Sequence, residues 1–208
     1  MCKTTKLFFL LFFISPFVNG QTDPKTRYDF VNFFMKTQVI ENLDFYYLYS
    51  QPITIKWDKE LSDSLKNHLD PVDFVFVKES ILAYDTNFKW DQSEIIKGKV
   101  IDNEKSSEIR SKNMHQSNFP YKNGKPIITP RPLIPKEEQQ YFELSIPIFN
   151  KTESLVIIYF NLIAGNHGEY QKFIYHRINN HWELLTHLRG ITMHQAFNFP
   201  INHLYLRS

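Results

Sequence analysis

Cysteine is almost absent from this chain of 208 residues, because the only one is Cys2. A disulfide, a thiolate metal site and a cysteine nucleophile all need cysteine further along the chain, so none of them is expected. The chain also lacks the G-x-G-x-x-G and P-loop motifs of nucleotide binding and the G-x-S-x-G motif of serine hydrolases. These absences exclude several chemistries without selecting one.

The first twenty residues have the pattern of a secretion signal. Lys3 and Lys6 precede an apolar run from Leu7 to Val18, which is shorter than the about 20 residues of a membrane-spanning helix. We expect cleavage after Gly20, so that residues 1–20 are a signal peptide, with an uncleaved anchor as the alternative. The sequence therefore predicts a secreted or periplasmic protein with no stable membrane span after cleavage.

Charge is balanced once the signal is removed. Loss of Lys3 and Lys6 lowers the number of basic residues from 24 to 22, against 22 acidic residues. A neutral chain lacks the basic surface of a nucleic-acid binder, so no nucleic-acid partner is expected. Aromatic residues make up 16% of the sequence, which favours a packed globular domain over disorder.

Local signals predict that residues 24–101 are mainly helical. Apolar residues recur at helical spacing in three segments: 24–40, 59–67 and 71–83. The third segment has the clearest start, because Asp70 can cap the helix and Pro71 fits its first position.

Residues 102–136 show no regular pattern and are expected to be irregular. Asn123-Gly124 and Pro130-Arg131-Pro132 are turn and extended signals. The proline-rich stretch 126–135 has two interpretations, an extended segment that docks a partner and a stiff connector. A long irregular segment in a compact domain is often functional or mobile.

Residues 137–190 predict an antiparallel β-meander of about four strands, at 142–148, 155–163, 169–178 and 181–188. The second strand is apolar on both faces, so we expect it to be central and covered on both sides. Asn179-Asn180 can adopt positive φ and fits a two-residue hairpin. This hairpin pairs His176 with Glu183, Tyr175 with Leu184, and Phe173 with Thr186.

These elements predict one α+β domain over residues 21–208. N-terminal helices are expected to pack on one side of the C-terminal antiparallel meander, with residues 191–208 as a tail.

Several short motifs follow one another in an order that resembles the layout of a known group of proteins. They are Asp70-Pro71-Val72-Asp73-Phe74, Phe88-Lys89-Trp90-Asp91, Ser145-Ile146-Pro147-Ile148-Phe149, the turn from Gly165 to Gly168, and Asn179-Asn180-His181-Trp182. Over about residues 60–190 the chain is similar to small secreted, uncharacterised proteins of Bacteroidota. The resemblance implies a compartment and a fold, and no activity.

Histidine is concentrated near the end of the chain, with six of the eight histidines in the last 42 residues. The hairpin register places three of them on one face, as candidate metal ligands: His176, His181 and His187. Candidate acid–base residues come from the same region: His167, Glu169, His176 and Glu183. The competing interpretation is a solvated sheet face with a His–Glu cross-strand pair, because no H-x-x-x-H or H-E-x-x-H motif occurs.

The leading functional hypothesis is a non-catalytic protein that binds another protein or a cell-envelope component, without a cofactor. One alternative is a metal-assisted or acid–base hydrolase that uses the His and Glu residues named above. A second is a carbohydrate-binding module, in which Trp57, Trp90 and Trp182 would form an exposed stacking platform.

Overall fold

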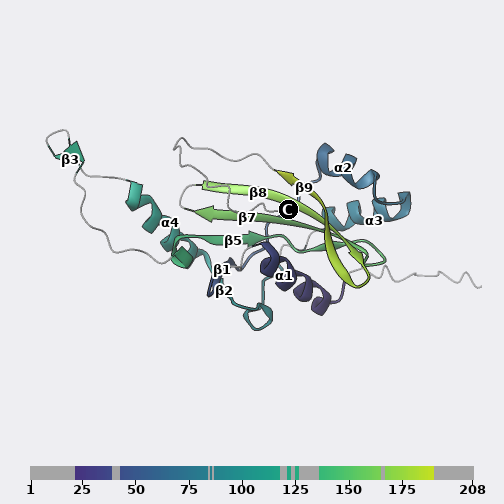
Figure 1. The fold of residues 1–208 in the computed structure, drawn as a ribbon, viewed down its shortest axis with the longest axis horizontal. Coiled ribbons are helices and arrows are strands. Elements are labelled where there is room, and N and C mark those ends of the chain that lie inside the picture. Colours follow the sequence, from purple (N-terminus) through teal and green to yellow (C-terminus); the bar gives the residue numbers. More distant parts are fainter. Residues whose placement is uncertain are drawn as a thin grey trace, which may run out of the picture.

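The computed structural model describes residues 22–38, 43–83, 85, 87–117, 121–122, 125–126, 136–164 and 167–189. Over these residues it has four α-helices and a mixed, mostly antiparallel sheet of seven strands, so the α+β class is confirmed (Figure 1). The expected signal peptide, residues 127–135 of the proline-rich stretch and the tail at 191–208 lie outside the described residues.

Three of the helices match the predicted segments. They are α1 (Pro24–Gln38), α2 (Lys59–Lys66) and α3 (Pro71–Leu82), and the fourth is α4 (Asn103–Ser117). Side-chain caps explain where two of them begin. Asp58 accepts a hydrogen bond from the Leu61 N–H, and Asp70 accepts from the N–H groups of Val72 and Asp73. Two 3₁₀ helices, η2 (Gln92–Glu94) and η3 (Lys136–Gln139), connect the larger elements.

The main sheet has the strand order β2-β1-β5-β7-β8-β9, and β6 pairs with β7. Its strands are β1 (Tyr46–Tyr49), β2 (Gly98–Ile101), β5 (Tyr141–Leu144), β6 (Ile148–Phe149), β7 (Leu155–Ala164), β8 (His167–Ile178) and β9 (His181–Arg189). The pairs β1–β2 and β1–β5 are parallel and the others are antiparallel. Two short strands, β3 (Tyr121–Lys122) and β4 (Lys125–Pro126), pair separately.

Strand β7 is buried on both faces, as its sequence predicts. On one face Val156 and Ile158 pack with residues of α1, including Phe30 and Phe34. On the other face Leu155, Ile157 and Tyr159 pack with α2 and α3 through three fully or nearly buried side chains: Leu61, Leu65 and Val77. Figure 1 shows α1 on one side of the sheet, and α2 and α3 on the other.

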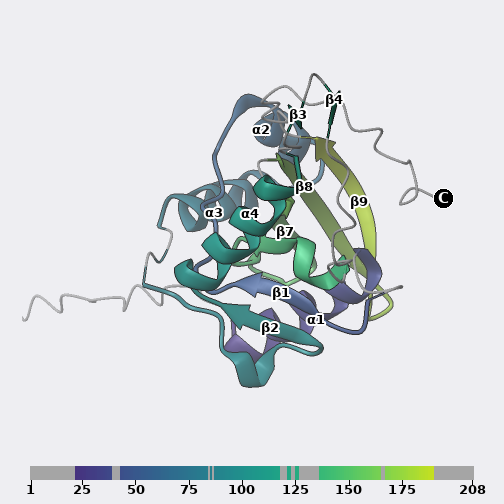
Figure 2. The same cartoon turned by 90° about the vertical axis from the view of Figure 1, so that its left-hand side faces the viewer.

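The expectation that the helices pack on one side of the sheet is therefore wrong. A strand that is apolar on both faces must be covered on both, and a single helical layer cannot do this. Figure 2 shows α2, α3 and α4 on the same side of β7, β8 and β9.

Helix α4 corrects the expectation that residues 102–136 are irregular and that the helices are all N-terminal. Its sequence is mostly polar and lacks the apolar periodicity that predicts a helix. Accordingly, only Ser106 and Ile109 are buried among its described side chains. The helix start is marked by Asp102, whose side chain accepts from the Lys105 N–H at 3.0 Å.

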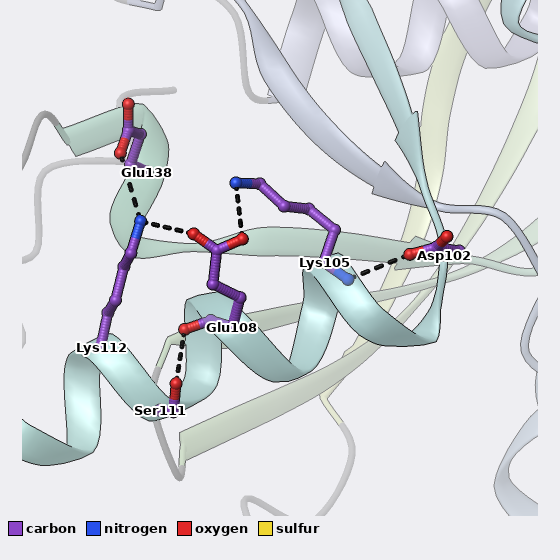
Figure 3. A network of polar contacts seen from close by, with 6 residues as sticks. All are labelled: Asp102, Lys105, Glu108, Ser111, Lys112 and Glu138. Atoms are coloured by element: carbon purple, nitrogen blue, oxygen red, sulfur yellow. Dashed lines mark hydrogen bonds and ion pairs between the residues drawn. The ribbon is translucent and has the colours of Figure 1, made fainter.

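Charged side chains support α4 along its exposed face (Figure 3). Glu108 lies 2.6 Å from Lys112 and 2.9 Å from Lys105, and Lys112 also approaches Glu138 of η3 at 3.9 Å. Hydrogen bonds from Lys112 and Lys105 lower the pKa of Glu108 to about 2. Pairs spaced three and four residues apart stabilise exposed helices modestly.

Strands β1 and β2 correct the mainly helical assignment of residues 24–101. With the division of the predicted strand 142–148 into β5 and β6, they also correct the strand number of about four. Strands β1 and β2 each have only four residues, and their parallel partners come from distant parts of the sequence. Alternation over so short a run gives no clear strand signal, so these pairings become visible only in the tertiary structure.

The hairpin between β8 and β9 has the predicted register near its turn. Asn179 and Asn180 adopt positive φ, of 48° and 64°, and Tyr175 lies opposite Leu184. Beyond that pair the register is shifted by a β-bulge. Phe173 therefore lies opposite His187, and the predicted pairing with Thr186 is wrong.

Candidate functional site

The β8–β9 hairpin brings together only part of the predicted histidine group. His176 Nε2 lies 3.8 Å from Glu183 Oε2, and both side chains are partly open to solvent. Directly opposed residues of an antiparallel pair share a face, so the pairing of Ile178 with His181 places His181 on the same face as His176. This is the face of the sheet that α2 and α3 cover.

The β-bulge carries His187 to the opposite face. Its ring stacks on Phe173, with centroids 4.5 Å apart and planes 6° apart, and its Nε2 lies 3.0 Å from Gln171 Oε1. An extra residue in one strand turns each later side chain of that strand to the other face of the sheet. His187 therefore lies on the opposite face from His176 and His181. Within the described residues no group of three or more His, Cys, Asp and Glu side chains is suited to hold a metal ion.

The other acid–base candidates lie at the start of β8. His167 pairs with Ala164 and Glu169 pairs with Leu162 in the backbone register. Their side chains lie outside the described part of the structure, so their proposed chemistry stays a prediction.

The three tryptophans do not form a shared platform. Trp90 is 4% exposed, and its ring packs edge-on against Tyr28 and Phe88. Trp57 packs against Phe74, and Trp182 packs against Phe30 and Phe149. Each tryptophan therefore packs against aromatic rings of its own neighbourhood in the fold.

A depression of about 340 Å³ lies on the face that α2 and α3 cover. We call it the polar pocket, and it is lined by His68, Leu69, Asp70, Asp73, Asn150, Thr152, Ser154, Leu155, His176 and Leu185. Its lining comes from the α2–α3 connection, the start of α3, the β6–β7 turn and the β8–β9 hairpin. Of the residues in the predicted histidine group, His176 is the one that lines it. Its volume falls in the range of small-ligand sites.

Asn150 holds the wall of the polar pocket in place. It is 4% exposed, and its Nδ2 donates to Asp73 Oδ2 at 2.8 Å. Its Oδ1 accepts from the backbone N–H groups of Ser154 and Leu155, each at 2.9 Å. Because one buried amide joins the β6–β7 turn to the first turn of α3, the two segments form one edge of the pocket.

A second depression of about 360 Å³ lies along the outer side of α3. We call it the apolar groove, and it is lined by Pro71, Val72, Val75, Phe76, Glu79 and Lys151. Val72 is 63% exposed and Val75 is 50% exposed, and Leu82, on the same helix face, is 67% exposed. The inner face of α3 is apolar too, since Val77 and Ile81 are buried. Exposed aliphatic side chains that gather on the open side of a packed helix are typical of a binding surface.

A buried polar group lies elsewhere, beneath α4. Glu143 accepts from Asn161 Nδ2 at 2.7 Å, and Arg110 lies 3.7 Å from the other Glu143 oxygen. Burial raises the pKa of the Glu143 carboxyl, and the contacts with Asn161 and Arg110 oppose the rise. Arg110 also donates to the Tyr141 hydroxyl at 2.5 Å. The sequence pattern does not reveal this group, because Glu143 alternates with Phe142 and Leu144 and so has the position of an outward-facing strand residue.

No family model, no curated protein and no solved structure matches the chain. Within the described residues no helix is long and apolar enough to cross a membrane.

The candidate functional surface is defined by its geometry. It consists of the polar pocket and the apolar groove, on either side of the edge formed by α3 and the β6–β7 turn. The run Val72-Asp73-Phe74-Val75-Phe76-Val77 carries a signal that could have found the groove, because a helix with apolar residues on every face needs two partners.

Proposed function

We propose that this chain is an exported, non-catalytic protein that binds another protein through the outer face of α3. The observation that carries the proposal is the exposure of Val72, Val75 and Leu82 on one side of a helix whose other side is buried. Exposed aliphatic side chains are common singly, but three on one helix face form an apolar strip, which Glu79 interrupts between Val75 and Leu82. Burial of such a strip is the main favourable term in protein association.

Export is the second part of the proposal and is supported by the sequence. Lys3, Lys6 and the apolar run that follows them have the order of a secretion signal. The partner would then be a protein outside the cytoplasm.

Site-specific photo-crosslinking in the cells that make the protein tests the binding surface. A benzoylphenylalanine at position 75 should give a discrete adduct with one partner protein, which mass spectrometry identifies. The matched control is the same residue at position 96, because Ile96 is 65% exposed and lies between η2 and β2, away from the groove. Identical adducts from both positions, or none from position 75, would contradict the proposal.

An acid–base hydrolase is the second candidate, and one observation favours it. His176 lines the polar pocket, and its Nε2 lies 3.8 Å from Glu183 Oε2, so a small movement of either side chain would bring the carboxylate into hydrogen-bond reach of the imidazole. The hydrolase hypothesis predicts that purified protein cleaves at least one ester, amide or glycoside in a substrate panel and that His176→Gln abolishes the cleavage. Activity that survives this substitution would remove His176 from the mechanism.

A further inference from the structure

The polar pocket and the apolar groove are formed by the same two segments. Asp70 and Asp73 line the pocket, while Val72 and Val75 line the groove. In the β6–β7 turn, Thr152 lines the pocket and Lys151 lines the groove. Because neighbouring residues contribute to different depressions, the two depressions adjoin along the edge where Asn150 is hydrogen-bonded to Asp73.

We infer that one segment of a partner protein occupies both depressions, with a lysine or arginine side chain in the polar pocket and adjacent aliphatic or aromatic side chains in the apolar groove. The inference rests on the proposed function and specifies the chemistry of the partner.

The charge of the polar pocket favours a cation. Its lining has two carboxylates, Asp70 and Asp73, and no lysine or arginine among the described residues. The positive end of α3 offsets about half a charge, because Asp70 accepts from the N–H groups of Val72 and Asp73. The two carboxylates therefore leave the lining with negative charge, and each carboxylate has a second oxygen that can accept from an ammonium or guanidinium group.

The apolar groove has the opposite preference. Glu79 and Lys151 offset each other in charge, and the remaining lining is Pro71, Val72, Val75 and Phe76. Such a lining favours apolar side chains, because a charged side chain would lose water there without gaining an ion pair. An anionic lipid surface is disfavoured as the occupant, because it would bring negative headgroups against Asp70 and Asp73.

A phage-displayed library of random peptides, selected on the immobilised full chain, tests the inference. Enriched peptides should carry a lysine or arginine close to two or more aliphatic or aromatic residues. The affinity of a synthesised, enriched peptide should fall about tenfold when norleucine replaces its lysine, since a charge-assisted hydrogen bond is lost.

Two variants separate the pocket from the groove. The double substitution Asp70→Asn and Asp73→Asn keeps hydrogen-bond acceptors at both positions, and should remove the preference for basic peptides while apolar peptides still bind. The control Asp44→Asn with Asp63→Asn removes two exposed acids elsewhere and should change nothing. Val72→Ser with Val75→Ser should abolish all enrichment.

The outcomes of this experiment test the inference separately from the proposed function. Enriched peptides without basic residues, or with acidic ones, that still require Val72 and Val75 would overturn the inference and leave the proposed function standing. No enrichment, or enrichment unaffected by the valine substitutions, would overturn both. Binding to anionic vesicles that depends on the same valines would point to a membrane partner instead and also contradict the inference.

Discussion

Asp70 sets the start of the helix that carries the candidate surface, and its replacement gives a quantitative test of the structure. Its Oδ1 accepts from the Val72 N–H at 2.8 Å and from the Asp73 N–H at 2.9 Å. Asp70→Ala removes both bonds and the carboxylate at the positive helix end, which should cost about 1–2 kcal/mol of unfolding free energy. Asp70→Asn keeps the cap and loses only the charge interaction, about 0.3–1 kcal/mol.

Equilibrium urea unfolding, followed by far-UV circular dichroism, measures these differences. The midpoint should fall further for Asp70→Ala than for Asp70→Asn, with the dependence on urea concentration unchanged. Asp63→Ala is the control, because Asp63 is exposed and its contact with Lys66 is a 3.4 Å surface pair. Equal losses for the alanine and asparagine variants would refute the capping role, and so would a loss as large for Asp63→Ala.

Three further predictions concern the buried acid, the core and the signal. Glu143→Gln should raise the free energy of unfolding at neutral pH. Burial raises the pKa of Glu143 in the folded state, so the stability that the protonated carboxyl contributes at acid pH is lost as the pH rises through that pKa. Glutamine is neutral at every pH and avoids this loss. The gain should vanish in urea titrations at acid pH; a gain that persists there would contradict the assignment. Phe34→Ala should lower the free energy of unfolding by about 3–5 kcal/mol in thermal or urea unfolding. The reason is that Phe34 is fully buried and its ring centroid lies 5.1 Å from that of Phe173. Phe33→Ala is the control and should lower it less, because Phe33 is only partly buried. Mass spectrometry of the N-terminal peptide of protein recovered outside the cytoplasm should find Gln21, free or cyclised to pyroglutamate, as the first residue, and a peptide beginning at Met1 would indicate an anchor rather than a cleaved signal.

The candidate surface could be predicted only in part, because its two depressions depend on contacts between distant segments. The sequence marks Asp70 as a cap and the following residues as an apolar helix. It does not show that the β6–β7 turn lies against this helix, since the Asn150–Asp73 hydrogen bond joins residues 77 positions apart. The polar pocket and the apolar groove therefore emerge only when that contact forms.

The histidine group shows how one local irregularity can change a site. A regular hairpin would place His176, His181 and His187 on one face, and the Asn179-Asn180 turn is formed as predicted. The β-bulge adds one residue to β9, so His187 stacks on Phe173 on the α1 side of the sheet. Nothing in the local pattern of β9 indicates a bulge, because the choice depends on which side chains pack best against both neighbouring layers.

The sequence by itself determined the elements whose signals are local. Caps and apolar periodicity predict α1, α2 and α3, and the two-sided apolar run of β7 predicts a covered central strand. The tertiary structure alone decided the parallel pairing of β1 with β2 and β5, the packing of α4 and the placement of helices on both faces of the sheet. The physical reason is range: a cap or a helical stripe is formed by residues a few positions apart, whereas short strands and a polar helix such as α4 are stabilised by partners that only the folded chain brings near.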